Sequence, residues 1–146
     1  MLVDGGDFHA SGPVFGPDND VVLIRDMRKD SPLWKFPGGK KQLVRRLGKK
    51  PRGETPLETL LRENKEETGL WLKKRNVLFV TSYDMGSYRK HVFLPRISSL
   101  RGLVPLSKEY EEAKVFKQDD LQWLSDFHPW YRDCYLQHIV PILNTQ

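Results

Sequence analysis

The sequence of 146 residues is poor in cysteine and contains no long apolar run. The single cysteine, Cys134, excludes an intrachain disulfide, and no Cys/His spacing of the zinc-binding kind is present. The longest apolar runs, such as residues 21–24, are as long as a strand and far shorter than a membrane span. The N-terminus lacks a basic start followed by an apolar stretch, so no secretory signal is expected. These absences favour a soluble, cytoplasmic protein without a membrane partner.

Two catalytic signatures are also absent. No serine or cysteine nucleophile arrangement is present, and no glycine cluster fits a P-loop. The composition is ordinary for a globular protein, and residues 1–146 suffice for a single domain that buries roughly two thirds of the unfolded chain's surface. The formal net charge of +5 favours encounter with polyanions such as nucleotides or nucleic acid. The sequence leaves the oligomeric state open.

Hydrophobic patterning predicts two hairpins, a short strand and a final helix. Turn-forming residues separate runs typical of strands, which predicts one hairpin from residues 12–15 and 21–26 and another from residues 76–83 and 88–97. Residues 114–117 are expected to form a short strand. Apolar residues recur at helical spacing from about residue 130 to 143, which predicts the last helix.

A glycine loop and a basic stretch lie between the hairpins. Pro37 has no backbone donor, and Gly38 and Gly39 allow backbone angles closed to other residues, so this loop should offer its backbone to a ligand. Residues 40–52, interpreted as an insertion, contain seven Lys or Arg in thirteen positions. The stretch either binds extra phosphates or an RNA backbone or is a solvated lysine loop. Three of its residues are expected to pack as a helical turn against the body: Leu43, Val44 and Leu47.

A helix over residues 55–68 is predicted to carry three carboxylates on one face. Its start combines a capping residue, a first-turn proline and a capping-box glutamate, and its stop is a glycine: Thr55, Pro56, Glu58 and Gly69. At about 100° per residue, Glu63, Glu66 and Glu67 fall within an arc of about 100°. Like charges at this spacing repel, whereas Mg²⁺ is bound by such carboxylates together with substrate phosphates. Arg62 can brace them, but a solvated face with ordinary Glu–Arg pairs is the alternative reading.

A longer motif contains this helix. It reads Gly, five residues, Glu, seven residues, then Arg-Glu-x-x-Glu-Glu-x-Gly-aliphatic, and it is formed by Gly48, Glu54, Arg62, Glu63, Glu66, Glu67, Gly69 and Leu70. This pattern resembles the Nudix box, and residues 34–39 resemble the segment that precedes the box in that family. The resemblance implies an α/β fold, the Nudix-type α/β/α sandwich with a mixed β-sheet. It also implies a hydrolase that uses Mg²⁺, or Mn²⁺, to cleave a diphosphate bond.

The resemblance implies roles for individual residues. Glu63, Glu66 and Glu67 are expected to bind metal, Arg62 is expected to orient Glu63, and Glu54 is expected to support the site. The family's glycine loop donates a carbonyl ligand, and here two glycines compete for that role. Gly48 fits the motif's spacing, but Gly39 follows the Pro-Gly segment, and we favour Gly39 as the metal ligand.

The helix departs from the family at Asn64, where an aliphatic residue is usual. The helical wheel places Asn64 on the core-facing side, and a polar group buried without partners costs about 1–3 kcal/mol. We therefore expect Asn64 to form hydrogen bonds to the backbone or to a nearby loop.

The general base has more than one candidate. Family members place it either directly after the box arginine or on a later loop, so Glu63 competes with Glu111 and Glu112. One of the later glutamates is alternatively a metal ligand, or residues 109–112 form a solvated acidic loop.

The expected substrate is a nucleoside diphosphate linked to another group. Nucleotide sugars, dinucleoside polyphosphates and 5′-phosphorylated or capped RNA are the candidates, and the residues expected on the substrate side are Lys40, Arg45, Arg46 and Glu54. The rival hypothesis is a Nudix-like module that binds a nucleotide or RNA without hydrolysing it.

Overall fold

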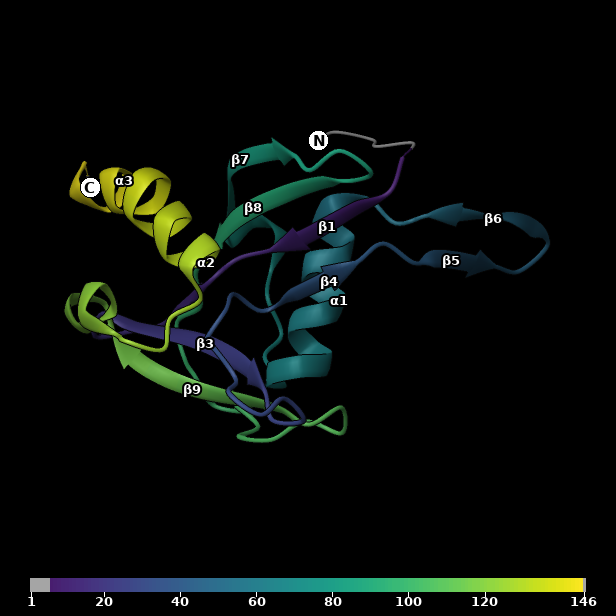
Figure 1. The fold of residues 1–146 in the computed structure, drawn as a ribbon. Helices are drawn as coiled ribbons and strands as arrows, with labels where there is room; N and C mark the ends of the chain where they lie inside the picture. Colours follow the sequence, from purple (N-terminus) through teal and green to yellow (C-terminus); the bar gives the residue numbers. More distant parts are fainter. Residues whose placement is uncertain (1–5, 146) are drawn as a thin grey trace.

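The computed structural model describes residues 6–145 as two packed β-sheets flanked by helices (Figure 1). The first sheet is mixed, because its two central strands run parallel and its outer pairs run antiparallel. Its strand order is β4 (Gly38–Lys40), β1 (Phe8–Ser11), β8 (Arg89–Pro95) and β7 (Val77–Asp84).

The second sheet is antiparallel throughout. Its order is β2 (Val14–Phe15), β3 (Asp20–Asp26) and β9 (Glu111–Lys117). A bridge between Phe15 and Arg96 links it to the first sheet. Because β3 pairs with β9 over its whole length, residues that are far apart in the sequence lie side by side.

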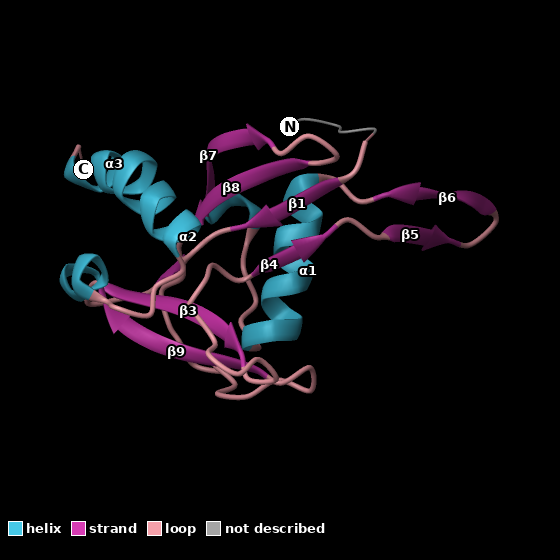
Figure 2. Cartoon of the chain, viewed as in Figure 1, coloured by secondary structure: helices cyan, strands magenta, loops and turns pink. Residues whose placement is uncertain are grey.

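Helices cover the sheets on two sides (Figure 2). On one side, α1 (Pro56–Thr68) buries Leu60 against Phe8, Ala10 and Phe93 of the first sheet. On the other side lies a continuous helical segment made of α2 (Pro129–Cys134), the π-helical turn η3 (Tyr135–Ile139) and α3 (Val140–Asn144). Two 3-10 turns, η1 (Lys74–Asn76) and η2 (Gln118–Trp123), complete the helical elements. The predicted α/β/α sandwich with a mixed sheet is confirmed.

Most of the predicted elements are confirmed. The two hairpins appear as β2–β3 and β7–β8, residues 114–117 lie within β9, and the last helix runs from Pro129 to Asn144. Thr55 and Glu58 form the capping box at the start of α1, and Gly69 ends the helix with φ at 78°. In residues 6–145 no helix is long and apolar enough to cross a membrane.

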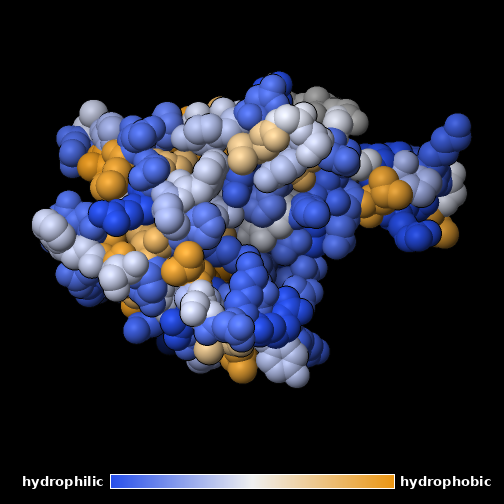
Figure 3. All heavy atoms as spheres, viewed as in Figure 1, coloured by the Kyte–Doolittle hydropathy of each residue, from blue (hydrophilic) through white to orange (hydrophobic). Residues whose placement is uncertain are grey.

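The expected helical turn in the basic stretch is wrong. That stretch forms a separate hairpin, β5 (Leu43–Arg46) and β6 (Lys49–Gly53), which projects from the body (Figure 1). Leu43 is 67% exposed and Leu47 is fully exposed at the turn, so neither packs against the body. Figure 3 shows this projection as mainly hydrophilic, with small hydrophobic patches.

The expectation for Asn64 is also wrong in its main point. Its side chain is fully buried, yet Nδ2 has no hydrogen-bond partner among the described residues. Its Oδ1 lies 3.5 Å from Thr68 Oγ1, which is long for a hydrogen bond. The Thr68 hydroxyl instead donates to the backbone carbonyl of Asn64 at 2.6 Å. The Asn64 side chain thus has neither the predicted bond to the backbone nor the one to a loop among the described residues, and its described contact lies within the helix.

Candidate functional site

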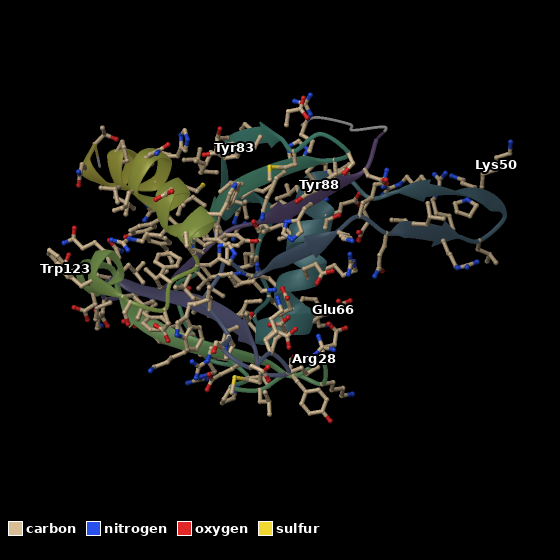
Figure 4. The ribbon with its side chains drawn as sticks, viewed as in Figure 1. Arg28, Lys50, Glu66, Tyr83, Tyr88 and Trp123 are labelled. Atoms are coloured by element: carbon tan, nitrogen blue, oxygen red, sulfur yellow. The ribbon has the colours of Figure 1, made fainter. Side chains whose placement is uncertain are left out.

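Arg62 of α1 is the centre of a carboxylate network. Its Nε and Nη2 donate to the two oxygens of Glu54 at 2.8 and 3.0 Å, a bidentate pair. Its Nη1 donates to Glu63 at 3.0 Å and to Glu66 at 3.1 Å. One guanidinium therefore fixes three carboxylates at once, as the planar fork of arginine allows. Glu66, on the outer part of this face, is labelled in Figure 4.

Glu54 anchors this network to the chain before the helix. It is 7% exposed, and its Oε1 also accepts from the Thr59 hydroxyl and the Gln42 backbone, each at 2.9 Å. Burial by itself raises the pKa of Glu54, but the hydrogen bonds from Arg62, Gln42 and Thr59 outweigh it and hold the pKa below its ordinary value. Glu54 is thus an ionised support for Arg62, with its oxygens already committed to protein donors.

Glu67 is the most deeply placed carboxylate of the helix face. It is 4% exposed, and one oxygen accepts from the Gly38 backbone N–H at 2.8 Å. Burial raises its pKa to about 9, and the neighbouring charges of Glu63 and Glu111 act in the same direction. A carboxylate in such surroundings is ionised at neutral pH only when a cation offsets its desolvation.

The glycine loop comes into direct contact with Glu63. A Cβ on Gly39 would lie 2.4 Å from the Glu63 carboxyl carbon, so only glycine fits there without displacing the carboxylate. Gly48, by contrast, lies in the turn of the projecting hairpin with φ at 68°, and an added Cβ would meet nothing within 4 Å. The geometry therefore supports Gly39, and not Gly48, as the loop glycine of the site.

The two later glutamates lie on opposite faces of β9. Glu111 is 7% exposed and faces the α1 side, where its charge contributes to the raised pKa of Glu67. Its Oε2 has no hydrogen-bond partner among the described residues. Glu112 points to the other face and accepts from Arg25 Nε at 2.6 Å. The structure therefore brings Glu111 to the carboxylate cluster and leaves Glu112 outside it.

The basic residues predicted on the substrate side are separated. Lys40 borders the site, because its carbonyl accepts from Arg62 Nη2 at 2.9 Å. Arg45 and Arg46 lie in β5, and Arg46 donates within the hairpin to the Lys50 carbonyl. Neither arginine contacts a carboxylate of α1 in a described interaction.

Sequence reasoning gave no separate role to two charged neighbours of the cluster, Lys35 and Glu109. Lys35 lies 3.8 Å from Glu111 and lowers the pKa of both Glu111 and Glu67 against the larger effect of burial. Glu109 contributes to the pKa of Glu63, which burial raises to about 6. Both residues occur in segments that the sequence had already singled out, residues 34–39 and 109–112, but their spacing gives no sign of where they point.

A surface hollow of about 560 Å³ adjoins Glu66 at the C-terminal end of α1. It combines carboxylate, cationic and apolar lining and is large enough for part of a nucleotide. Its lining residues are Lys65, Glu66, Gly69, Val104, Leu106, Ser107, Lys108 and Glu109.

A divalent cation fits these residues chemically. Within residues 6–145, no three His, Cys, Asp or Glu side chains already converge in the manner of a metal cage. Glu63 and Glu66 are instead turned to Arg62, and Glu67 to the Gly38 N–H. Yet the donors are all carboxylate oxygens, Glu67 is buried beside like charges, and one Glu111 oxygen has no described partner. This is the oxygen-rich, anionic donor set that Mg²⁺ prefers.

The fold and this cluster together define a class of protein, an α/β sandwich that carries a carboxylate-rich helix beside a glycine loop. A model of the NUDIX domain matches residues 8–137, and the chain therefore belongs to the Nudix pyrophosphohydrolase family. Members of this family typically use divalent metals. No curated protein sequence matches the chain significantly.

Solved structures of the same fold resemble this chain at low sequence identity. A MutT protein from Methanosarcina mazei is 17% identical, with all of both chains covered and a TM-score of 0.66. A Nudix hydrolase family member from Chromobacterium violaceum is 21% identical, with 99% of this chain and 83% of that chain covered and a TM-score of 0.64. A MutT structure from a study of Aliivibrio salmonicida and Vibrio cholerae is 22% identical, covering 79% and 82%, with a TM-score of 0.58. These likenesses support the fold.

Proposed function

We propose that this protein is a Mg²⁺-dependent hydrolase that cleaves the diphosphate bond of a nucleoside diphosphate linked to another group. Nucleotide sugars, dinucleoside polyphosphates and 5′-phosphorylated or capped RNA are the substrate candidates. The observation that carries the proposal is the network in which Arg62 holds Glu54, Glu63 and Glu66 beside the buried Glu67. These four carboxylates carry more negative charge than Arg62 offsets, and a divalent cation would offset the remainder.

Glu63, Glu66 and Glu67, with the backbone of Gly39, would hold the metal. When bound, Mg²⁺ or Mn²⁺ neutralises charge on phosphoryl oxygens and lowers the pKa of an attacking water. Arg62 keeps Glu63 and Glu66 in place and offsets part of their mutual repulsion. The Gly38 N–H fixes one oxygen of Glu67, which leaves the other oxygen for a ligand.

Three glutamates are candidates for the general base. Glu63 lies against the glycine loop, and Glu111 presents an oxygen without a described partner on the same side of the protein. Glu112 is the weaker candidate, because Arg25 holds it on the opposite face of β9. Separate Glu63→Gln and Glu111→Gln variants distinguish the candidates, since only loss of the base removes the corresponding limb of the pH–rate profile.

The decisive experiment measures turnover with Mg²⁺ on a panel of diphosphate-linked substrates. Glu66→Gln should reduce kcat/KM on the order of 10³-fold, comparable to losing a major electrostatic contact in an active site. Asp119→Asn, an exposed carboxylate change in η2, should leave kcat/KM unchanged.

Absence of turnover across the panel, together with retained binding of nucleotide or RNA, would overturn the proposal. The protein would then be the alternative, a non-catalytic Nudix-like nucleotide- or RNA-binding module. Equal activity of the wild type and Glu66→Gln would show that Glu66 is not a ligand of the metal.

A further inference from the structure

The hairpin β5–β6 and its base form a surface with one sign of charge. We call residues 40–53 the basic arm; they contain seven Lys or Arg and no Asp or Glu. The arm projects from the body, and Lys50 marks its outer part in Figure 4. Its cations occur along the whole length, from Lys40 and Lys41 at the base to Lys49 and Lys50 beyond the turn.

Most of these charges are not neutralised by the protein. Arg52 is the exception, because it forms a bidentate pair with Glu58 at 2.7 and 2.8 Å. Four exposed side chains of the arm have no ion pair or side-chain hydrogen bond among the described residues: Lys40, Arg45, Lys49 and Lys50.

The pairing within the arm places like charges opposite each other. Arg46 lies directly opposite Lys49, and like charges in opposed positions destabilise a strand pair. A two-stranded hairpin is only marginally stable in water, and this one exposes both Leu43 and Leu47. The charges of Lys40, Arg45, Lys49 and Lys50 therefore have no evident role in holding the fold together.

The base of the arm is fixed to the proposed active site. Gln42 and Glu54 exchange two hydrogen bonds, one from each backbone N–H, both at 2.9 Å. Arg62 binds the Lys40 carbonyl with the same guanidinium that holds the carboxylates of α1. The arm thus leaves the body at a defined place beside α1.

A hollow at the arm's base adds an aromatic element. Its volume is about 490 Å³, and Tyr88, labelled in Figure 4, is 37% exposed there. Lys41 lies over the Phe8 ring, with Nζ 5.6 Å from the ring centroid. The hollow is lined by Asp7, Phe8, His9, Lys40, Lys41, Ser87 and Tyr88.

We propose that the basic arm and this hollow bind the phosphate backbone of a nucleic acid, with one base placed against Tyr88. Unpaired cations spaced along a ribbon match a chain of phosphates, and their binding releases counterions from the nucleic acid. An exposed aromatic ring beside cations is the usual platform for an unpaired base. The proposal goes beyond diphosphate hydrolysis and does not depend on it.

Two other occupants fit the arm less well. A membrane-binding hairpin gathers its cations at headgroup depth and presents aromatic or several apolar residues beyond them. The arm instead has cations along its full length, no aromatic residue and one apolar side chain, Leu47, at its turn. A second copy of the arm would be repelled by the same charges.

The test is a binding titration with a dye-labelled 12-nucleotide RNA that has no 5′ phosphate, followed by fluorescence anisotropy at several salt concentrations. The arm variant combines Arg45→Gln, Lys49→Gln and Lys50→Gln. The matched control removes the same charge from exposed residues around η1 and combines Lys73→Gln, Lys74→Gln and Arg75→Gln.

The arm variant should bind RNA at least tenfold more weakly at low salt, with a log–log salt slope shallower by about 2, since each lost phosphate contact on a single strand contributes about 0.7. The control should stay within threefold of wild type. The single variant Tyr88→Ala should also bind RNA more weakly than the wild type, without a change in the salt slope. Unchanged melting temperatures should show that the arm variant is folded.

Parallel titrations with single-stranded DNA and duplex RNA identify which nucleic acid supplies the backbone. Equal loss of affinity in the arm variant and the control would overturn the proposal, because net charge alone would then explain binding. Arm-dependent binding to phosphatidylserine vesicles without binding to any nucleic acid would overturn it as well. So would a concentration-dependent dimer that the arm variant abolishes.

Discussion

The face of α1 and the basic arm are neighbours in the chain, but the protein treats their charges in opposite ways. On α1, Arg62 holds three carboxylates, and a backbone N–H holds Glu67. On the arm, exposed cations extend into solvent, and Arg52 alone has a described carboxylate partner. The charged groups on α1 are bound by protein partners and partly buried, whereas most charged groups on the arm are exposed to solvent.

Burial determines how strongly the ion pairs of each region affect stability and activity. Arg62–Glu54 and Arg52–Glu58 have the same bidentate geometry, but the Glu54 side chain is 7% exposed and the Glu58 side chain 25%. Water and salt screen an exposed pair, so it contributes little to stability, while removing one partner of a more buried pair leaves a charge without compensation. Residues of the same type in the two regions therefore form matched tests of this difference.

The largest difference is expected between the two arginines. Arg62→Lys keeps the charge but removes the fork, so Glu54, Glu63 and Glu66 can no longer be held together. Metal-dependent kcat/KM should fall by about 10–100-fold, as for other residues that orient metal ligands. Steady-state kinetics with titrated Mg²⁺ measures the change.

Arg52→Lys is the matched control, because it breaks the same geometry at an exposed pair. It should change kcat/KM by less than about twofold and leave the melting temperature nearly unchanged, because water screens an exposed ion pair. Comparable losses in both variants would show that burial does not distinguish the two regions.

A smaller difference is expected between the two glycines. Gly39→Ala places a methyl group against the Glu63 carboxyl group and should weaken Mg²⁺ binding about tenfold, as for other changes that misplace a metal ligand. Gly48→Asn tolerates the positive φ and meets nothing, so Mg²⁺ affinity should not change. Isothermal titration calorimetry compares the two, and a loss confined to Gly48→Asn would return the loop role to Gly48.

The smallest expected effects are on protein stability. The contributions of Glu67 and Glu58 to stability should depend on pH in opposite ways. The pKa of Glu67 is raised by burial to about 9, so without metal its folded form binds more protons than its unfolded form. The contribution of Glu67 to the free energy of unfolding therefore decreases as pH rises from about 4.5 towards 9. Glu67→Gln should therefore raise the melting temperature of the metal-free protein at pH 8 by about 2–4 °C, with less gain at pH 5.

The contribution of Glu58 to stability should depend on pH in the opposite direction. The hydrogen bond from Arg52 lowers its pKa to about 2, so its contribution is present above pH 4.5 and is lost as pH falls towards 2. Glu58→Gln should lower the melting temperature slightly at pH 7, with a difference that disappears on acidification. Calorimetric scans across pH would contradict this account if both variants changed in the same direction.

Local signals made α1 predictable. Thr55, Glu58 and Gly69 act within a few residues, so capping and termination could be inferred without knowledge of the rest of the fold. The arm was mispredicted because both of its faces are exposed, which removes the alternation that identifies a strand. β1 was missed because a four-residue strand is too short to show a period.

Long-range geometry accounts for what the sequence could not supply at the site. Choosing between Glu111 and Glu112 depends on which face of β9 turns towards α1, and a shift of one residue would exchange them. Choosing between Gly39 and Gly48 depends on where the arm leaves the body. The motif spacing favours Gly48, which lies in the turn of the arm, whereas the glycine beside Glu63 is Gly39.

The pairing of β3 with β9 has a consequence for biosynthesis. Glu63, Glu66 and Glu67 leave the ribosome well before Glu111, and β3 has no β9 partner until residues 111–117 are made. Pairings between such distant segments form slowly, since the entropy of closing the intervening loop is lost first. The arm, whose strands are neighbours, can form early. A nascent chain therefore displays its cations before its carboxylate cluster is complete.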